Sequence, residues 1–463
     1  MKTLLLAIII CLSAPTVYAL EFHRGAEGQT ILTFKQNGKT VYERIGTGGD
    51  GWPELEERRY YNAPEETSSK LQGLTPIEPD KVPYPQFNHE LRGSMSGSSG
   101  NTLWEVKNEW NWDWELKYSK WITENLTPDF FTRARVATAC SDIAYDLRWI
   151  FTRENNLPAA NHLTTGELFT QRSVRDSWQH LPSAKEWYND QRFRAALNYL
   201  NEHTFTHTLW ADSYPILINK DSLIPGAYHV NKDKDHGHTM VVWRVSDLPQ
   251  EIPVVTLSST TPRAVRDLDA FMYLEAKSDI RHLALLRMRW PVFKGNQLEL
   301  TPSDQMPSYS LEQFSPSFVA APRTKFWEEI FNRIDPNLNF EVIAVKSLQQ
   351  LIPMFQKRVN LVTDGYAHCS HHQCPTGSQG YEDWSTDSRD NRIQSVHDVF
   401  EAFQSKAEDK SQFGPLLDQV IVHVEGRDLT LDQASYLIPY LEQNAKLSVW
   451  VRWGLSKLPF YKR

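Results

Sequence analysis

The order of two hydrophobic periodicities in the middle of the chain constrains its fold more than any other feature. Helical spacing comes first, in segments such as "VATACSDIAYDLRWI", and residues 166–208 predict two or three further helices. After residue 209 the pattern changes to short β-prone runs, "LWADSYPILI", "GAYHV", "HTMVVWRV" and "IPVVTL", with turns between them. Helices followed by strands predict an α+β domain over residues 102–304, with the strands in an antiparallel sheet.

A tryptophan-rich segment at the start of this domain, "LWEVKNEWNWDWELKYSKW", fits both periodicities. Alternate residues are tryptophan over part of it, as in a strand, and aromatic residues also recur at helical spacing. The run lacks Gly and Pro, which favours the helix, and the helical positions are Trp110, Trp114, Tyr118 and Trp121. A second helix is expected to begin near Pro128, to break or restart near Cys140, and to end near residue 154.

The first residues, "MKTLLLAIIICLSAPTVYA", have the form of a secretory signal peptide over residues 1–19. Lys2 precedes a short apolar run, and a small residue, Ala19, ends the segment. Ile10 stands before Cys11 where a lipoprotein signal needs a small residue, so we expect no lipid anchor. No later apolar run is long enough to span a bilayer. The sequence therefore predicts a soluble periplasmic or secreted protein.

Composition changes along the chain predict three further regions. A small β unit is expected over residues 20–61, with a hairpin turn at Asn37-Gly38. Residues 62–101 are rich in Pro, Ser and Gly and predict a linker. Residues 305–463 predict a mainly helical C-terminal domain, which is a candidate surface for a protein partner. Within it, Thr430 and Gln433 form a capping-box pattern.

Charge argues against nucleic acid as a partner. The 463 residues carry a formal net charge of -8, and no long basic run is present. Nothing in the residues calls for a cofactor.

Export makes the cysteines informative, because removal of the signal peptide leaves three. Cys369 and Cys374 flank "SHHQ" and can close a small ring in an oxidising compartment. A metal site is the alternative there, since histidines surround the pair, although adjacent residues do not converge easily on one ion. The acidic residues that follow, in "YEDWSTDSRDNR", have no EF-hand spacing and are expected in a solvated loop.

Cys140 is then left without a partner, and an unpaired thiol in an exported protein is either buried or used. A cysteine nucleophile needs a helix N-terminus or an imidazole that stabilises its thiolate. His238 opens a β-prone run downstream, and Thr256 and Ser258 lie on one face of the next strand. These residues are candidates for nucleophile, general base and orienting group.

This arrangement resembles the NlpC/P60 cell-wall hydrolases of the papain-like superfamily. The matching residues are Cys140-Ser141, the turn Leu223-Ile224-Pro225-Gly226, and Gly237-His238. The resemblance covers about residues 135–268 and implies a papain-like fold and thiol-dependent cleavage of peptide or amide bonds, with peptidoglycan as the expected substrate. It implies Cys140 as nucleophile, His238 as general base, and Thr256 or Ser258 as orienting residue. This chain departs from the family pattern at Ala139, Asp142 and Ala227.

Two other interpretations remain open. Cys140 also belongs to an apolar helical stripe, which favours a buried core residue and a non-catalytic binding or scaffold protein with a degenerate papain-like domain. Alternatively, carboxylates among tryptophans are the chemistry of a glycosidase, and the candidates are Glu109, Asp113 and Glu115.

Overall fold

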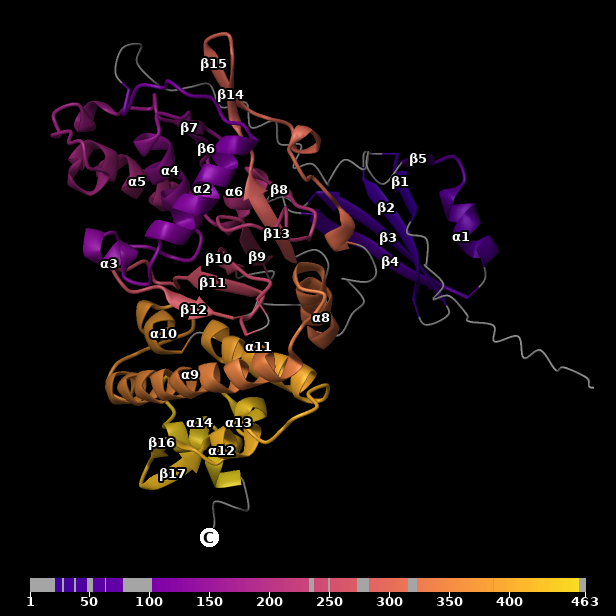
Figure 1. The fold of residues 1–463 in the computed structure, drawn as a ribbon, viewed down its shortest axis with the longest axis vertical. Helices are drawn as coiled ribbons and strands as arrows, with labels where there is room; N and C mark the ends of the chain where they lie inside the picture. Colours follow the sequence, from indigo (N-terminus) through magenta and orange to yellow (C-terminus); the bar gives the residue numbers. More distant parts are fainter. Residues whose placement is uncertain are drawn as a thin grey trace, which may run out of the picture.

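The computed structural model describes most of the chain beyond the expected signal peptide, residues 1–19, which lies outside the described residues. The described ranges are 21–26, 29–36, 39–47, 53–62, 64–77, 102–232, 237–248, 250–272, 283–314, 323–385 and 387–457. They form a mixed α+β structure (Figure 1). No helix within these ranges is both long and apolar enough to cross a membrane.

The N-terminal region is a five-stranded antiparallel sheet with the strand order β4-β3-β2-β1-β5. Strands β2 and β3 form an antiparallel pair in which Gln36 lies opposite Lys39. The turn expected between them, at Asn37-Gly38, lies outside the described residues. The unit extends past the boundary expected at residue 61, because β5 pairs with β1. A helix and a strand therefore lie in the expected linker. The elements are β1 (Glu21–Arg24), β2 (Thr30–Gln36), β3 (Lys39–Thr47), β4 (Pro53–Tyr61), α1 (Pro64–Leu71) and β5 (Thr75–Ile77).

The central region begins with helices, as the periodicity predicts. The tryptophan-rich helix is present but starts at Trp112, where the Asn111 side chain accepts a hydrogen bond from the Trp114 amide. The chain before it runs as an extended segment, in which the Trp110 indole donates to the Pro158 carbonyl. The helices and short strands of this part are α2 (Trp112–Asn125), α3 (Phe130–Ala134), α4 (Asp142–Glu154), β6 (Ala160–His162), β7 (Leu168–Thr170), α5 (Gln191–His203) and α6 (Thr206–Ala211).

A six-stranded antiparallel sheet follows, with the strand order β12-β11-β10-β9-β13-β8. Its central strands, β9 and β10, are buried on both faces, because helices cover the sheet from both sides. The strands are β8 (Ser213–Pro215), β9 (Tyr228–Lys232), β10 (Gly237–Val245), β11 (Val254–Ser258), β12 (Asp269–Phe271) and β13 (Leu283–Met288), and a separate hairpin is formed by β14 (Pro291–Lys294) and β15 (Gln297–Leu300).

The C-terminal region is mainly helical, as expected, and its longest helix has 30 residues. The capping box at Thr430 and Gln433 is confirmed at the start of α13. An additional hairpin, β16 with β17, was not expected. The elements are α8 (Arg323–Ile334), α9 (Phe340–Cys369), α10 (Gln379–Trp384), α11 (Asp387–Gln404), α12 (Phe413–Leu417), β16 (Val420–Val424), β17 (Arg427–Thr430), α13 (Leu431–Ser435) and α14 (Val449–Arg452).

Two hydrophobic cores lie on opposite faces of the six-stranded sheet. Val241 and Leu257 pack with α4 and α5 on one face. Met240, Val242 and Val254 pack on the other face with residues of α8, α9 and α11. Figure 1 shows the same layering, with the sheet between the purple helices of the central region and the orange helices of the C-terminal region. The C-terminal helices and the sheet therefore share one core.

Candidate functional site

The Cys140 thiol lies two residues before α4, beside the first part of β10. Backbone hydrogen bonds between Thr138 and Ala264, of 3.0 and 3.3 Å, hold the preceding chain against the segment after β11. The Asp142 carboxylate then accepts a hydrogen bond of 2.8 Å from the Ala139 amide at the start of the helix. Cys140 is thus at a helix N-terminus, as a cysteine nucleophile requires.

The sulfur atom contacts the backbone on either side of His238. Its distance to the Gly237 carbonyl oxygen is 3.7 Å. The Thr239 backbone, the Thr206 side chain and the Arg392 charge also act on the thiol, and each of them lowers its pKa. Cys140 is 5 % exposed, and burial, followed by the Asp142 charge, raises the pKa of its thiol. The environment therefore favours a protonated thiol.

The ring of His238 lies on the other face of β10. Side chains alternate along a strand, so His238 shares its face with Met240 and Val242, which belong to the core with the C-terminal helices. A Cβ added to Gly237 would meet the Thr206 side chain, which is the group that contacts Cys140. The Cys140 thiol therefore lies near the backbone of β10 beside His238, but the strand separates it from the imidazole ring.

The contacts of the His238 ring come from β11 and α11. Its Nε2 atom is 2.8 Å from the Ser258 hydroxyl and 3.2 Å from the Nη2 atom of Arg392. A guanidinium has only donors, so Nε2 accepts and the proton of the neutral ring is on Nδ1. Burial, then Arg392 and His229, lowers the pKa of His238 well below its usual value. The imidazole is thus held neutral.

Thr256 and Ser258 share a face of β11, as their spacing predicted, but only Ser258 reaches the histidine. The Thr256 hydroxyl is 3.3 Å from the Phe271 carbonyl oxygen and 3.5 Å from the Met240 sulfur. The structure therefore brings together His238 and Ser258 of the four expected catalytic residues. It does not join them to Cys140.

Arg392 was missed because it lies in the helical tail, 154 residues after His238. The sequence carries one weak signal for it. Arg389 and Arg392 are three residues apart and so fall on one face of α11, a helix that also presents Ile393 and Val396 to the core. Arginines beside the buried stripe of a helix indicate a polar interior contact.

A cavity of about 340 Å³ lies next to this group, between the sheet and the C-terminal helices. One wall is the segment from Thr260 to Phe271, and the other comes from α9, α10 and α11. Arg392 lines the cavity and also contacts His238, so a single guanidinium connects the two. Cavities of this size are typical of small-molecule sites.

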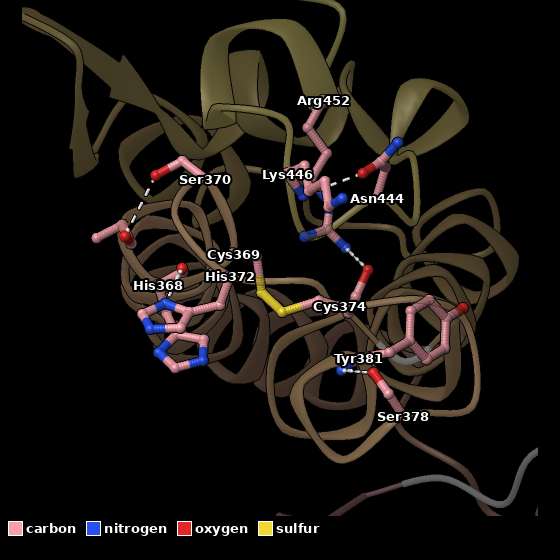
Figure 2. Close-up of a disulfide and its surroundings, with 12 residues drawn as sticks. His368, Cys369, Ser370, His372, Cys374, Ser378, Tyr381, Asn444, Lys446 and Arg452 are labelled. Atoms are coloured by element: carbon pink, nitrogen blue, oxygen red, sulfur yellow. Dashed lines mark hydrogen bonds between the residues drawn. A yellow bond between two sulfur atoms is a disulfide. The ribbon is translucent and has the colours of Figure 1, made fainter.

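The expected disulfide between Cys369 and Cys374 is present at the end of α9, with the two Cα atoms 5.6 Å apart (Figure 2). The nearby His368 and His372 rings stack with centroids 4.3 Å apart. Both sulfurs are used in the bond, and within the described ranges no group of three or more His, Cys, Asp or Glu residues could hold a metal ion.

The carboxylates among the tryptophans are arranged as structural groups. Glu109 and Asp113 are exposed, whereas Glu115 is buried and accepts hydrogen bonds of 3.1 and 2.8 Å from Arg148. Burial alone would raise the pKa of Glu115, but Arg148 and then Arg287 hold it below its usual value. A carboxylate held ionised in this way is a poor general acid for glycoside cleavage.

Comparisons with known proteins give no family for this chain. No family model, curated protein or solved structure matches it.

Proposed function

We propose that this chain is an exported, non-catalytic binding protein whose central region is a degenerate papain-like domain. The papain-like assignment is supported by a cysteine at the N-terminus of a helix that packs on an antiparallel sheet. The order of helices before strands also agrees with it. Export is supported by the signal-like N-terminal segment and by a disulfide, which is rare in reducing compartments.

One observation carries the non-catalytic part of the proposal. The Cys140 sulfur contacts Thr206 on one face of β10, whereas the His238 ring contacts Ser258 and Arg392 on the other. General-base catalysis needs the base within hydrogen-bonding reach of the nucleophile. A strand between the two groups prevents that contact, and a loose apo geometry would not remove it.

The C-terminal helices support a binding role. They cover the sheet face that carries His238, and Arg392 donates a hydrogen bond to the Nε2 atom of the ring. The same helices leave a cavity whose walls come from both regions. A site built jointly by two regions is a common place for a ligand.

The competing function is a thiol hydrolase that cleaves peptide or amide bonds in peptidoglycan, with Cys140 as nucleophile. The helix N-terminus favours it, but the raised pKa of the thiol and the orientation of His238 do not.

Incubation of the full chain with peptidoglycan, with mass spectrometry of the soluble products, tests the proposal. Cys140→Ala is the matched control. We expect no release of peptides or sugars above a buffer blank by either protein. Release by the wild type that is lost in Cys140→Ala would establish the hydrolase and refute the binding protein.

A further inference from the structure

The cavity between the sheet and the C-terminal helices has an excess of positive charge. Its lining contains five cationic side chains, from Arg266, Lys357, Arg358, Arg389 and Arg392. Among the described residues it contains two carboxylates, from Asp269 and Asp383. The protein as a whole has a net charge of -8, so this local excess is opposite in sign to the rest of the molecule.

Ion pairs account for part of this charge. Arg358 forms two hydrogen bonds, of 2.6 and 2.7 Å, with Asp390, which lies behind the lining. Lys357 contacts Asp269 at 2.5 Å, and Arg392 is 3.9 Å from the same carboxylate. Among the described lining residues together with Asp390, five cationic side chains stand beside three carboxylates, and such a cluster gives the cavity a positive potential that attracts anions.

The arginines also influence one another. Burial, and then the charges of Arg358, Arg392 and Arg266, lowers the pKa of Arg389 to about 10. These four guanidinium groups line the same partly dehydrated cavity, so their charges repel one another. An anion placed among them would relieve that repulsion.

Most of the remaining lining is apolar, and Thr260 and Gln350 add two uncharged polar side chains. Phe271 contributes from the sheet side, and Met354 and Leu361 contribute from α9. The other apolar side chains are Pro262, Ala270, Pro353 and Ile393. An inorganic ion would leave this surface without a partner, whereas an organic molecule would cover it.

We propose that this cavity binds a small organic anion, with its acidic group held by Arg266, Arg389 and Arg392 and its apolar body against Phe271, Met354 and Leu361. Planar guanidinium forks match both carboxylate and phosphate oxygens, so the shared chemistry is an amphiphile with an oxyanion head. The inference rests on the proposed function, because it names the ligand class of the same site.

Isothermal titration of the full chain tests this inference with three probes of one chain length, decanoate, decyl phosphate and decanol. We expect saturable binding of at least one anion, and binding of decanol at least tenfold weaker. The two anions distinguish a carboxylate ligand from a phosphate ligand. Equal affinity for decanol, or no binding of either anion, would overturn the proposal.

Variants locate the site. Arg266→Gln and Arg389→Gln are expected to weaken anion binding at least tenfold each, and Leu361→Trp is expected to abolish it by filling the cavity without changing its charge. Arg244→Gln removes an exposed arginine that stacks on Trp243, outside the lining, and is expected to bind as the wild type does. Unchanged binding by the cavity variants, with their folding verified by circular dichroism, would contradict the inference.

These outcomes are separate from those that test the proposed function. Hydrolysis dependent on Cys140 would refute the binding protein whatever the titrations show. Failure of the titrations alone would remove the organic anion and leave the non-catalytic assignment intact.

Discussion

Burial controls the protonation of the side chains at the start of α4. Asp142 is buried beside Cys140, and burial raises its pKa to about 6 despite the hydrogen bond from the Ala139 amide. A carboxyl whose pKa is raised on folding contributes stability below its unfolded pKa, near 4, and that contribution is lost as pH rises through 6. Ionised Asp142 is therefore unfavourable at neutral pH.

Asp142→Asn should remove this dependence, because the amide oxygen can still accept from Ala139 and carries no charge. The unfolding free energy of the variant minus that of the wild type should rise by on the order of 2 to 3 kcal/mol as the pH increases from 4 to 8. Urea unfolding of both proteins at several pH values measures the difference. Parallel stability profiles would show that Asp142 keeps an ordinary pKa.

His229 should give the opposite trend. It lies opposite Met240 on β9, is 1 % exposed, and neither ring nitrogen has a hydrogen-bond partner. Burial lowers its pKa to about 3, so stability is lost as pH falls below the unfolded value near 6.5. The unfolding free energy of His229→Leu minus that of the wild type should therefore rise by about 2 kcal/mol as the pH falls from 7 to 5. A constant difference in urea unfolding across that range would contradict the assignment.

At the level of elements, the critical feature is the register of β10. A shift of one residue would move His238 to the face that carries Cys140. The alternation of the sequence could not decide between the faces, because Met240 and Val242 are as apolar as Val241 and both sides are buried. The order of elements, the helix start near Cys140 and the common face of Thr256 and Ser258 were predictable from local patterns. The face of His238 depends on the tertiary structure.

The disulfide at the end of α9 closes a short loop before α10 (Figure 2). Constraint of the unfolded chain by a loop of this length is worth about 2 kcal/mol. The double variant Cys369→Ala/Cys374→Ala should lose about that much in urea unfolding. The wild type treated with a reductant is the control and should show the same loss. An unchanged unfolding midpoint in both would mean that the bond contributes nothing.

At the scale of the whole molecule, the C-terminal helices are part of the fold of the sheet. Ile330, Leu348 and Phe355 pack in the same core as Met240 and Val242. The boundary expected near residue 304 therefore divides one core. This could not be read from the sequence, because an amphipathic helix shows which of its faces is buried but not what covers it.

Truncation after residue 304 should consequently expose the sheet face that carries His238. We expect an aggregated product, or one without a cooperative thermal transition, since a large apolar face would meet water. Truncation after residue 77 leaves only the N-terminal sheet unit. It does not expose that face, because the unit has its own hydrogen-bonded strands. A soluble fragment of residues 1–304 with a sharp unfolding transition would contradict the shared core.

The reactivity of the Cys140 thiol in the native protein tests the central claim most directly. Its rate of alkylation by iodoacetamide should be at least a hundredfold slower than in the unfolded chain at every pH from 5 to 8, and His238→Ala should not change it. In protein that lacks residues 1–19, and with them Cys11, Cys140→Ala provides the blank, because Cys369 and Cys374 are joined. Fast, stoichiometric alkylation below pH 7 that disappears in His238→Ala would show a thiolate paired with the imidazole, and the non-catalytic account would be wrong.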